Sequence, residues 1–169
     1  WPLQSSVVSD LLRSMDGRLA FQSQLSLEQN VVGEAVNTLQ ISSNLVGAEL
    51  TFPAPFAKPA AAEMPLDLKL EFGEPQEISG SFSNNLGFRL ALSEGEITSG
   101  LIYLGETQSN LDNLAAAQTD GLAIVGELPN AKLEDWTAFL AGFNSESDRD
   151  ELDSSIAFVD VHLDEFELY

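Results

Sequence analysis

The sequence predicts an α+β protein that is dominated by an antiparallel β-meander, with one N-terminal helix and one late helix. Two stretches place apolar residues at helical spacing, and most of the remaining chain alternates apolar and polar residues with period two. The connections between the alternating runs are short, which favours antiparallel pairing over crossovers. No linker divides residues 1–169, so we expect a single β-rich segment.

The composition supports a folded domain and excludes several classes of function. The chain has 169 residues, 44% of them hydrophobic, and a formal net charge of −20. Such acidity argues against nucleic-acid binding and against docking on anionic lipid headgroups, and it favours solubility. Cysteine is absent, which excludes disulfides and thiolate chemistry. The chain contains no signal peptide and no apolar run of transmembrane length, and its non-methionine start suggests a mature chain or a piece of a longer one.

The first element is a helix predicted over residues 2–15. Pro2 suits a first helical turn and Asp16-Gly17 is a stop signal. One apolar stripe runs along it, formed by Leu3, Val7, Leu11 and Met15.

Two strands are predicted next. In residues 17–27 one face is shared by Leu19, Phe21, Leu25 and Leu27. Residues 38–52 form the second strand, in which the apolar parity switches at Gly47, and a glycine at such a switch predicts a β-bulge.

A proline-rich bridge follows, with prolines at 53, 55, 59 and 65. Proline donates no hydrogen bond to a β ladder and holds its predecessor extended. We therefore expect an extended loop between two strands, with Phe56 and Met64 packed against the core or capping an open end of the sheet. A packed connector and a functional loop both fit this segment.

The rest of the chain predicts six more strands and a helix. Runs at 65–72, 77–82, 86–92 and 97–104 are separated by turn residues at Asn84-Asn85 and at 93–95. Residues 109–118 fit a short helix or a loop, and 121–128 form a strand. A helix is predicted over 131–143, where Leu133, Trp136 and Leu140 share a face. An acidic loop at 144–155 leads to a last strand within 154–169.

Residues suited to catalysis are scarce. His162 is the single histidine, and no nucleophile, phosphate-loop or dinucleotide motif is present. The carboxylates at 146–153 lack the central glycine of a calcium loop and surround Arg149. Carboxylate spacing alone does not exclude a glycosidase, but no aromatic-rich polar stretch suggests a sugar cleft. We expect no enzyme, no cofactor and no metal site.

The alternating strands need something to cover their apolar face. In one arrangement the helices and opposing strands bury this face in a closed two-layer core. In the other, the sheet curls into a trough whose apolar inner face stays partly open for an acyl chain.

Three sequence segments are more specific indicators of a protein family than the periodicity is. Residues 41–73 resemble a segment of the YhdP family of large bacterial envelope proteins, relatives of AsmA and TamB. Residues 121–140 are similar to the family's Gly-Leu-x-Ile-x-Gly-x-Leu strand followed by a Trp-bearing helix, and residues 15–27 are similar to its strand after a short helix. The matching positions in the first segment are Ser43, Asn44, Leu45, Gly47, Phe52, Pro53, Pro55, Lys58, Pro59, Pro65 and Leu66.

The resemblance implies one section of a much longer periplasmic protein that is anchored in the inner membrane. Family members look like continuous β grooves that carry phospholipid between the inner and outer membranes and support the outer-membrane permeability barrier. The implied partners are phospholipid acyl chains, adjacent segments of the parent chain, and inner- and outer-membrane proteins. No catalytic motif is implied, and none of the family's residues carries over individually.

Alternation alone selects the candidate lipid-binding residues, which belong to two strands of a curved, groove-like sheet. These are Leu66, Leu68, Leu70, Phe72, Leu86, Phe88, Leu90 and Leu92. The alternative function is a purely structural or protein-interaction β domain with no lipid path of its own, in which free strand edges stack on neighbouring segments.

Overall fold

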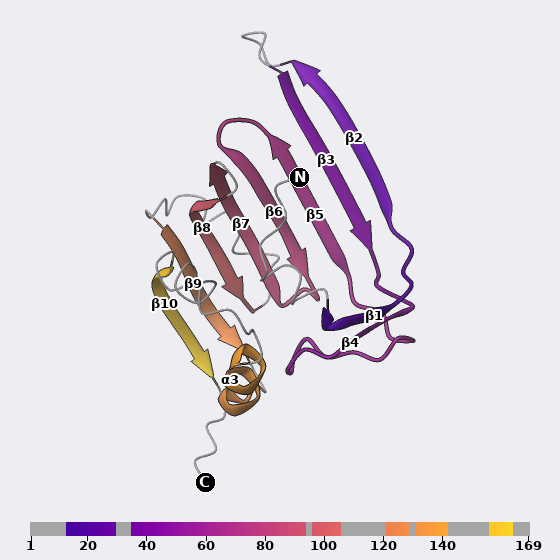
Figure 1. Cartoon of the computed structure of the whole chain (residues 1–169), viewed down its shortest axis with the longest axis vertical. Coiled ribbons are helices and arrows are strands. Elements are labelled where there is room, and N and C mark those ends of the chain that lie inside the picture. Colours follow the sequence, from indigo (N-terminus) through magenta and orange to yellow (C-terminus); the bar gives the residue numbers. More distant parts are fainter. Residues whose placement is uncertain are drawn as a thin grey trace.

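The described residues form a mixed eight-stranded β-sheet with a small second sheet and one short helix at one end (Figure 1). The computed structural model describes residues 13–29, 35–93, 96–105, 121–128, 131–141 and 156–163. The mostly β architecture predicted from the alternating sequence is confirmed.

The strands of the large sheet follow the order β10-β9-β8-β7-β6-β5-β3-β2. Their bounds are Gln22–Gln29 (β2), Ala35–Ser43 (β3), Leu66–Phe72 (β5), Gln76–Phe82 (β6), Leu86–Ser93 (β7), Glu96–Leu104 (β8), Gly121–Leu128 (β9) and Ile156–Leu163 (β10). The small sheet pairs β1 (Met15–Gly17) with β4 (Ala48–Leu50), and the described helix is α3 (Leu133–Ala141).

From β2 to β8 all neighbours in the sheet are antiparallel, as predicted. The turn between β6 and β7 places Ser83 and Asn84 in the left-handed region, with φ of 54° and 57°. Asparagine tolerates this conformation, and turns of this kind match the twist of a hairpin. The predicted turn at Asn84-Asn85 is therefore confirmed.

The expectation of a wholly antiparallel meander is wrong at the other end of the sheet. β8, β9 and β10 run parallel to one another. Parallel neighbours need a crossover of about a dozen residues or more. The chain has room for one between β8 and β9, at residues 105–120, and for another between β9 and β10, at residues 129–155.

The predicted bulge at Gly47 is also wrong. The strand ends at Ser43, and the chain reverses through Leu45 (φ 52°) and Gly47 (φ 95°) before β4 joins the small sheet. The amide of Leu45 donates to Ser43 Oγ (3.0 Å) and that of Gly47 to the carbonyl of Ala60 (2.7 Å). Gly47 is therefore at a change of sheet. The described register shifts lie elsewhere, at Ala91/Leu92 and at Ile156/Phe158.

The helices and loops meet the expectations unevenly. The N-terminal helix predicted over residues 2–15 falls mainly outside the described residues, and Met15, its predicted end, belongs to β1. β2 begins at Gln22, so Leu19 and Phe21 precede it. The late helix is confirmed as α3. Segment 109–118 and the acidic loop at 144–155 fall outside the described residues.

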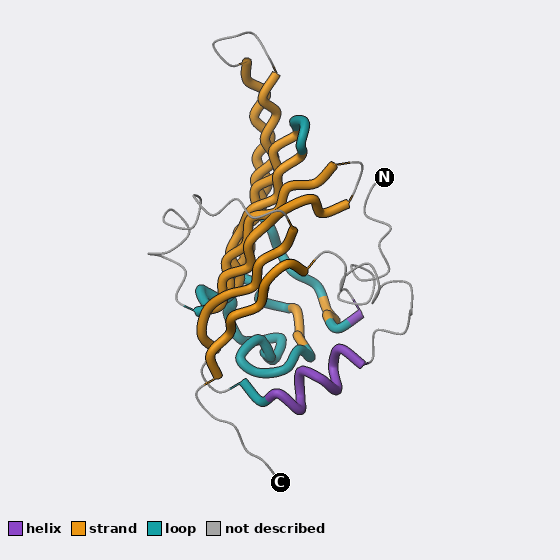
Figure 2. Tube along the Cα trace, turned by 90° about the vertical axis from the view of Figure 1, so that its left-hand side faces the viewer, coloured by secondary structure: helices purple, strands orange, loops and turns teal. Residues whose placement is uncertain are grey.

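Seen from its side, the large sheet is twisted, and the proline bridge and α3 lie together at one end of it (Figure 2). The strands that the structure describes do not show the predicted curling into a groove. These strands form one extended apolar face, and the proline bridge and α3 cover part of it.

Candidate functional site: an apolar sheet face covered at one end

Strand register brings the apolar side chains of the large sheet onto one face. Leu68 lies opposite Ile41 on one side and Gly80 on the other, and Gly80 lies opposite Phe88. The same row continues through Ile102 and Ile124 to Val159. Paired residues share a face of a sheet. We call this side the apolar face.

The eight candidate residues predicted from alternation all lie on the apolar face. Leu66 connects through Phe82 to Leu86, and Leu70 connects through Ile78 to Leu90. Their surroundings differ along the strands, because Leu66 packs against one buried cluster and Leu86 packs against another. The structure thus places the eight together, with two of them at the covered end.

The first cluster that covers the apolar face is formed by the proline bridge and the start of α3. Its buried members are Phe56, Leu104, Leu128 and Ala131, and we call it the end cluster. Phe56 packs at 5.5 Å from the ring of Phe82 and at 6.0 Å from that of Trp136, centroid to centroid. The indole Nε1 of Trp136 donates to the carbonyl of Ala54 at 3.0 Å. Of the two arrangements expected for Phe56, packing against the core is confirmed.

A second cluster lies beneath the bridge and joins the small sheet to the large one. Leu45, Leu50 and Met64 are its buried members, and Leu66 and Phe82 of the large sheet pack against it. The burial predicted for Met64 is therefore confirmed.

Sequence analysis missed the role of Lys58, which is only 5% exposed. Its ammonium donates to the carbonyls of Ala48 and of Pro59, the latter at 3.2 Å, and its backbone pairs with Leu50 in both directions. A buried ammonium needs such acceptors. The available signal was a single lysine inside an apolar, proline-rich stretch. Through these hydrogen bonds Lys58 holds the proline bridge against β4.

Away from the two clusters, the described residues of the apolar face are only partly covered. Leu39, Leu70, Ile78 and Leu90 are half-buried and belong to neither cluster. Towards β2 the exposure rises further, to 42% for Phe72, 59% for Leu25 and 71% for Leu27. A contiguous exposed apolar surface on a protein commonly marks a binding site.

Two glycines let large side chains lean across the apolar face. A Cβ on Gly80 would lie 3.1 Å from Phe88 Cζ and 2.3 Å from the carbonyl oxygen of Asp67. A Cβ on Gly100 would lie 2.6 Å from Leu90 Cδ2. Side chains from β7 thus occupy the space above glycines in β6 and β8, which keeps the face continuous where a side chain is missing.

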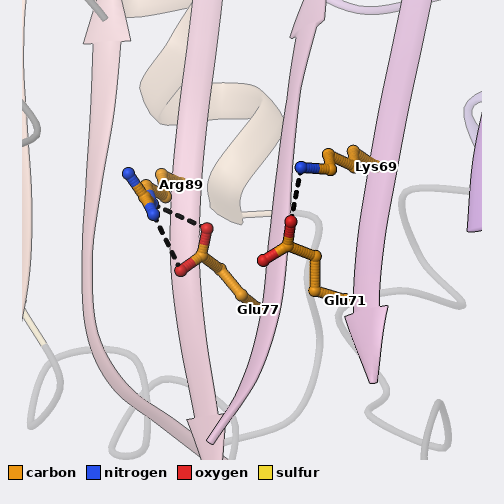
Figure 3. Close-up of polar contacts among 4 residues, drawn as sticks. All are labelled: Lys69, Glu71, Glu77 and Arg89. Atoms are coloured by element: carbon orange, nitrogen blue, oxygen red, sulfur yellow. Dashed lines mark hydrogen bonds and ion pairs between the residues drawn. The ribbon is translucent and has the colours of Figure 1, made fainter. Parts of the chain in front are cut away.

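The opposite face of β5, β6 and β7 is polar and carries two ion pairs (Figure 3). The guanidinium of Arg89 contacts both carboxylate oxygens of Glu77, at 2.7 Å and 3.0 Å, and Lys69 pairs with Glu71. The hydrogen bond to Glu77 raises the pKa of Arg89 above its ordinary value, against a smaller opposing effect of burial. Glu71 and Glu77 lie directly opposite each other, so each cation offsets a cross-strand repulsion.

A comparison of the whole sequence with known protein families assigns the chain to one of them. The family model described as YhdP protein matches residues 1–169. The chain belongs to the YhdP family. Neither the curated proteins nor the solved structures include a significant match to it.

Two searches of the described part of this YhdP-family chain looked for metal-binding groups and for membrane-spanning helices. No three histidine, aspartate or glutamate side chains gather into a metal-binding group among the described residues. Nor does any described helix have both the length and the apolar character needed to cross a membrane. His162 lies on β10, with its Nδ1 atom 3.9 Å from an Asp160 oxygen. The candidate site on these strands is the part of the apolar face that lies outside the two clusters.

Proposed function

We propose that this chain is a section of a periplasmic β-groove protein that carries phospholipid between the inner and outer membranes and so supports the permeability barrier of the outer membrane. The observation that carries the proposal is the open apolar face over β2, β3, β5, β6 and β7. Membership of the YhdP family and its resemblance to membrane-anchored envelope proteins support the location.

The mechanism is passive. An acyl chain that lies on the leucine and phenylalanine side chains of β5 and β7 is removed from water, which favours binding by about 0.8 kcal/mol per buried methylene. The headgroup stays at the solvated rim, because the acidic chain offers few cations to attract it. No bond is made or broken, so a surface without catalytic side chains is sufficient.

The covered end limits where an acyl chain can lie on this section. Phe56 and Trp136 occupy the apolar face over Phe82 and Leu86, so that an acyl chain has room only on the rows beyond them. The candidate lipid contacts therefore narrow to Leu68, Leu70, Phe72, Phe88, Leu90 and Leu92. Leu66 and Leu86 instead hold the cover in place.

Native mass spectrometry with lipid extraction from the same sample tests the proposal. We expect a bound phospholipid on the unmodified chain, and its loss in Leu90→Asp, where a carboxylate interrupts the apolar face. Ser79→Asp is the matched control: Ser79 faces the polar side between Lys69 and Arg89, which favour an added carboxylate. A lipid-free unmodified chain, or equal retention by both variants, would overturn the proposal.

A second candidate function is a structural or protein-interaction β domain without a lipid path. The observation in its favour is that two long strands, β2 and β10, form the outer edges of the large sheet as described, and unpaired edges are surfaces for strand addition. A chain that binds no phospholipid but captures neighbouring segments of its parent would support this function instead.

A further inference from the structure

The cationic side chains of the described residues lie away from the part of the apolar face outside the two clusters, which we call the open part. Lys69 and Arg89 are on the polar face of β5 and β7, and each is paired with a glutamate (Figure 3). The other described cations belong to the proline bridge or flank β1 and α3, all at the covered end of the sheet: Arg13, Arg18, Lys58 and Lys132. Among the described residues, therefore, no cation offsets a negative charge that is placed on the open part.

The end of the large sheet that is farthest from the cover is acidic. The antiparallel order places three connections at this end, between β2 and β3, between β5 and β6, and between β7 and β8 (Figure 1). Their sequences, NVVGE, GEP and EG, contain no lysine or arginine, and each contributes one glutamate: Glu34, Glu74 and Glu94. A charged headgroup near this end meets a negative potential, which reaches about 8 Å from each charge at physiological ionic strength.

The polar groups that share the apolar face at this end include two uncharged amides. Asn37 lies opposite both Leu27 and Phe72, and Gln76 lies opposite Leu92. Paired residues share a face of a sheet, so Asn37 is placed between two exposed apolar side chains. An amide both donates and accepts hydrogen bonds. It can therefore contact a phosphate oxygen without carrying a charge.

We propose that the open part of the apolar face selects phospholipids by headgroup charge, and that it takes a zwitterionic headgroup with an ammonium in preference to an anionic one. The inference rests on the proposed lipid-carrying function. An anionic headgroup is repelled by the carboxylates and finds no described cation with which to pair. In a zwitterionic headgroup the phosphate accepts hydrogen bonds from the two amides, and the ammonium is attracted by the surrounding carboxylates. The selection is electrostatic and requires no closed pocket.

Competition between two phospholipids in one vesicle population tests the selection. The chain is incubated at physiological salt with vesicles that contain phosphatidylethanolamine and phosphatidylglycerol in equal amounts and with the same acyl chains. Mass spectrometry then identifies the lipid recovered with the chain. Because both lipids share one vesicle, the docking step is the same for both. We expect about fivefold more of the ethanolamine lipid, and a ratio close to one in about 1 M salt, where charges are screened beyond about 3 Å.

The outcomes of this competition separate the selection from the lipid-carrying function itself. Equal recovery of the two lipids at physiological salt, or an excess of the glycerol lipid, overturns the selection alone. A preference that persists undiminished in high salt also overturns it, because an electrostatic preference is screened. Recovery of neither lipid overturns the proposed function and this inference with it.

Two lysine variants of β6 test which charges are responsible. Gln76→Lys adds a cation to the apolar face at the open end, whereas Ser81→Lys adds one to the polar face, opposite Asp67 and Gly87. Both variants change the net charge equally. We expect Gln76→Lys to reduce the preference for the ethanolamine lipid to about twofold or less, and Ser81→Lys to leave it unchanged. Equal shifts in the two variants, or no shift in either, would show that the open part does not select the headgroup and would overturn the proposal.

Discussion

At the scale of single residues, Trp136 connects α3 to the proline bridge. Its indole N–H donates to Ala54, and its ring meets those of Phe56 and Phe139, each at a centroid distance of 6.0 Å. We expect Trp136→Phe to lose the hydrogen bond, at about 0.5–1.5 kcal/mol in the free energy of unfolding, and to keep most of the ring packing. Trp136→Ala should lose roughly 2 kcal/mol more, because the ring contacts go too. Urea unfolding followed by circular dichroism measures both losses, and equal losses would show that the ring contributes no packing.

Gly126 is a second residue whose role can be tested singly. It has a φ of 128°, and a Cβ there would lie 1.9 Å from the carbonyl oxygen of Leu104 in the neighbouring strand. Both the left-handed backbone and the close approach exclude a side chain, so Gly126→Ala should cost about 3 kcal/mol or prevent folding. Gly73→Ala is the matched control, since its Cβ would meet only Pro75 O, at 3.4 Å. The prediction fails if the two variants unfold at the same urea concentration.

At the scale of elements, the proline bridge and α3 form the cover of the apolar face. Phe56 is the bridge residue at the centre of that cover, at 3% exposure. We expect Phe56→Ala to cost about 3–5 kcal/mol and to increase the binding of a fluorescent hydrophobic dye, because rows near Phe82 and Leu86 become accessible. The same truncation of Phe72, on the open part of the face, should cost roughly 1 kcal/mol and leave dye binding unchanged or lower. Higher dye binding in Phe72→Ala than in Phe56→Ala would contradict this assignment of cover and open face.

Elements also show how far the sequence could predict the fold. Period-two alternation located the strands from β5 to β9 well, because a half-buried strand must place every second side chain in the core. It could not predict that β9 and β10 are parallel, since alternation is the same for either direction. Nor could it separate β3 from β4, because the parity switch at Gly47 fits a bulge as well as a turn into another sheet.

The candidate site could also be predicted only in part from the sequence. The alternation of side chains along β5 and β7 was enough to place the eight candidate residues on one face. Residues that pair between neighbouring strands point to the same side of the sheet, so the alternation continues from strand to strand. Which of those residues are covered depends on contacts between distant segments, such as Trp136 with Ala54. The burial of Lys58 depends likewise on the carbonyl of Ala48, ten residues away. Contacts of this kind leave no local pattern in a sequence.

At the scale of the whole molecule, the large sheet has two chemically different faces over β5, β6 and β7. One is apolar and partly open, and the other carries the ion pairs of Lys69 and Arg89. Exposed pairs of this kind contribute at most about 1 kcal/mol each. Their consequence is the polar, hydrated character of that face. The asymmetry leads to the central claim that acyl chains lie against one face only.

Photo-crosslinking from adjacent positions of β6 tests that claim most directly. Ile78 lies on the apolar face and Ser79 on the polar face, so a benzophenone side chain at each position samples opposite sides of one strand. After irradiation with phospholipid vesicles, we predict a phospholipid adduct by mass spectrometry at position 78 and none at position 79. Adducts in equal yield at both positions, or at neither, would contradict the account.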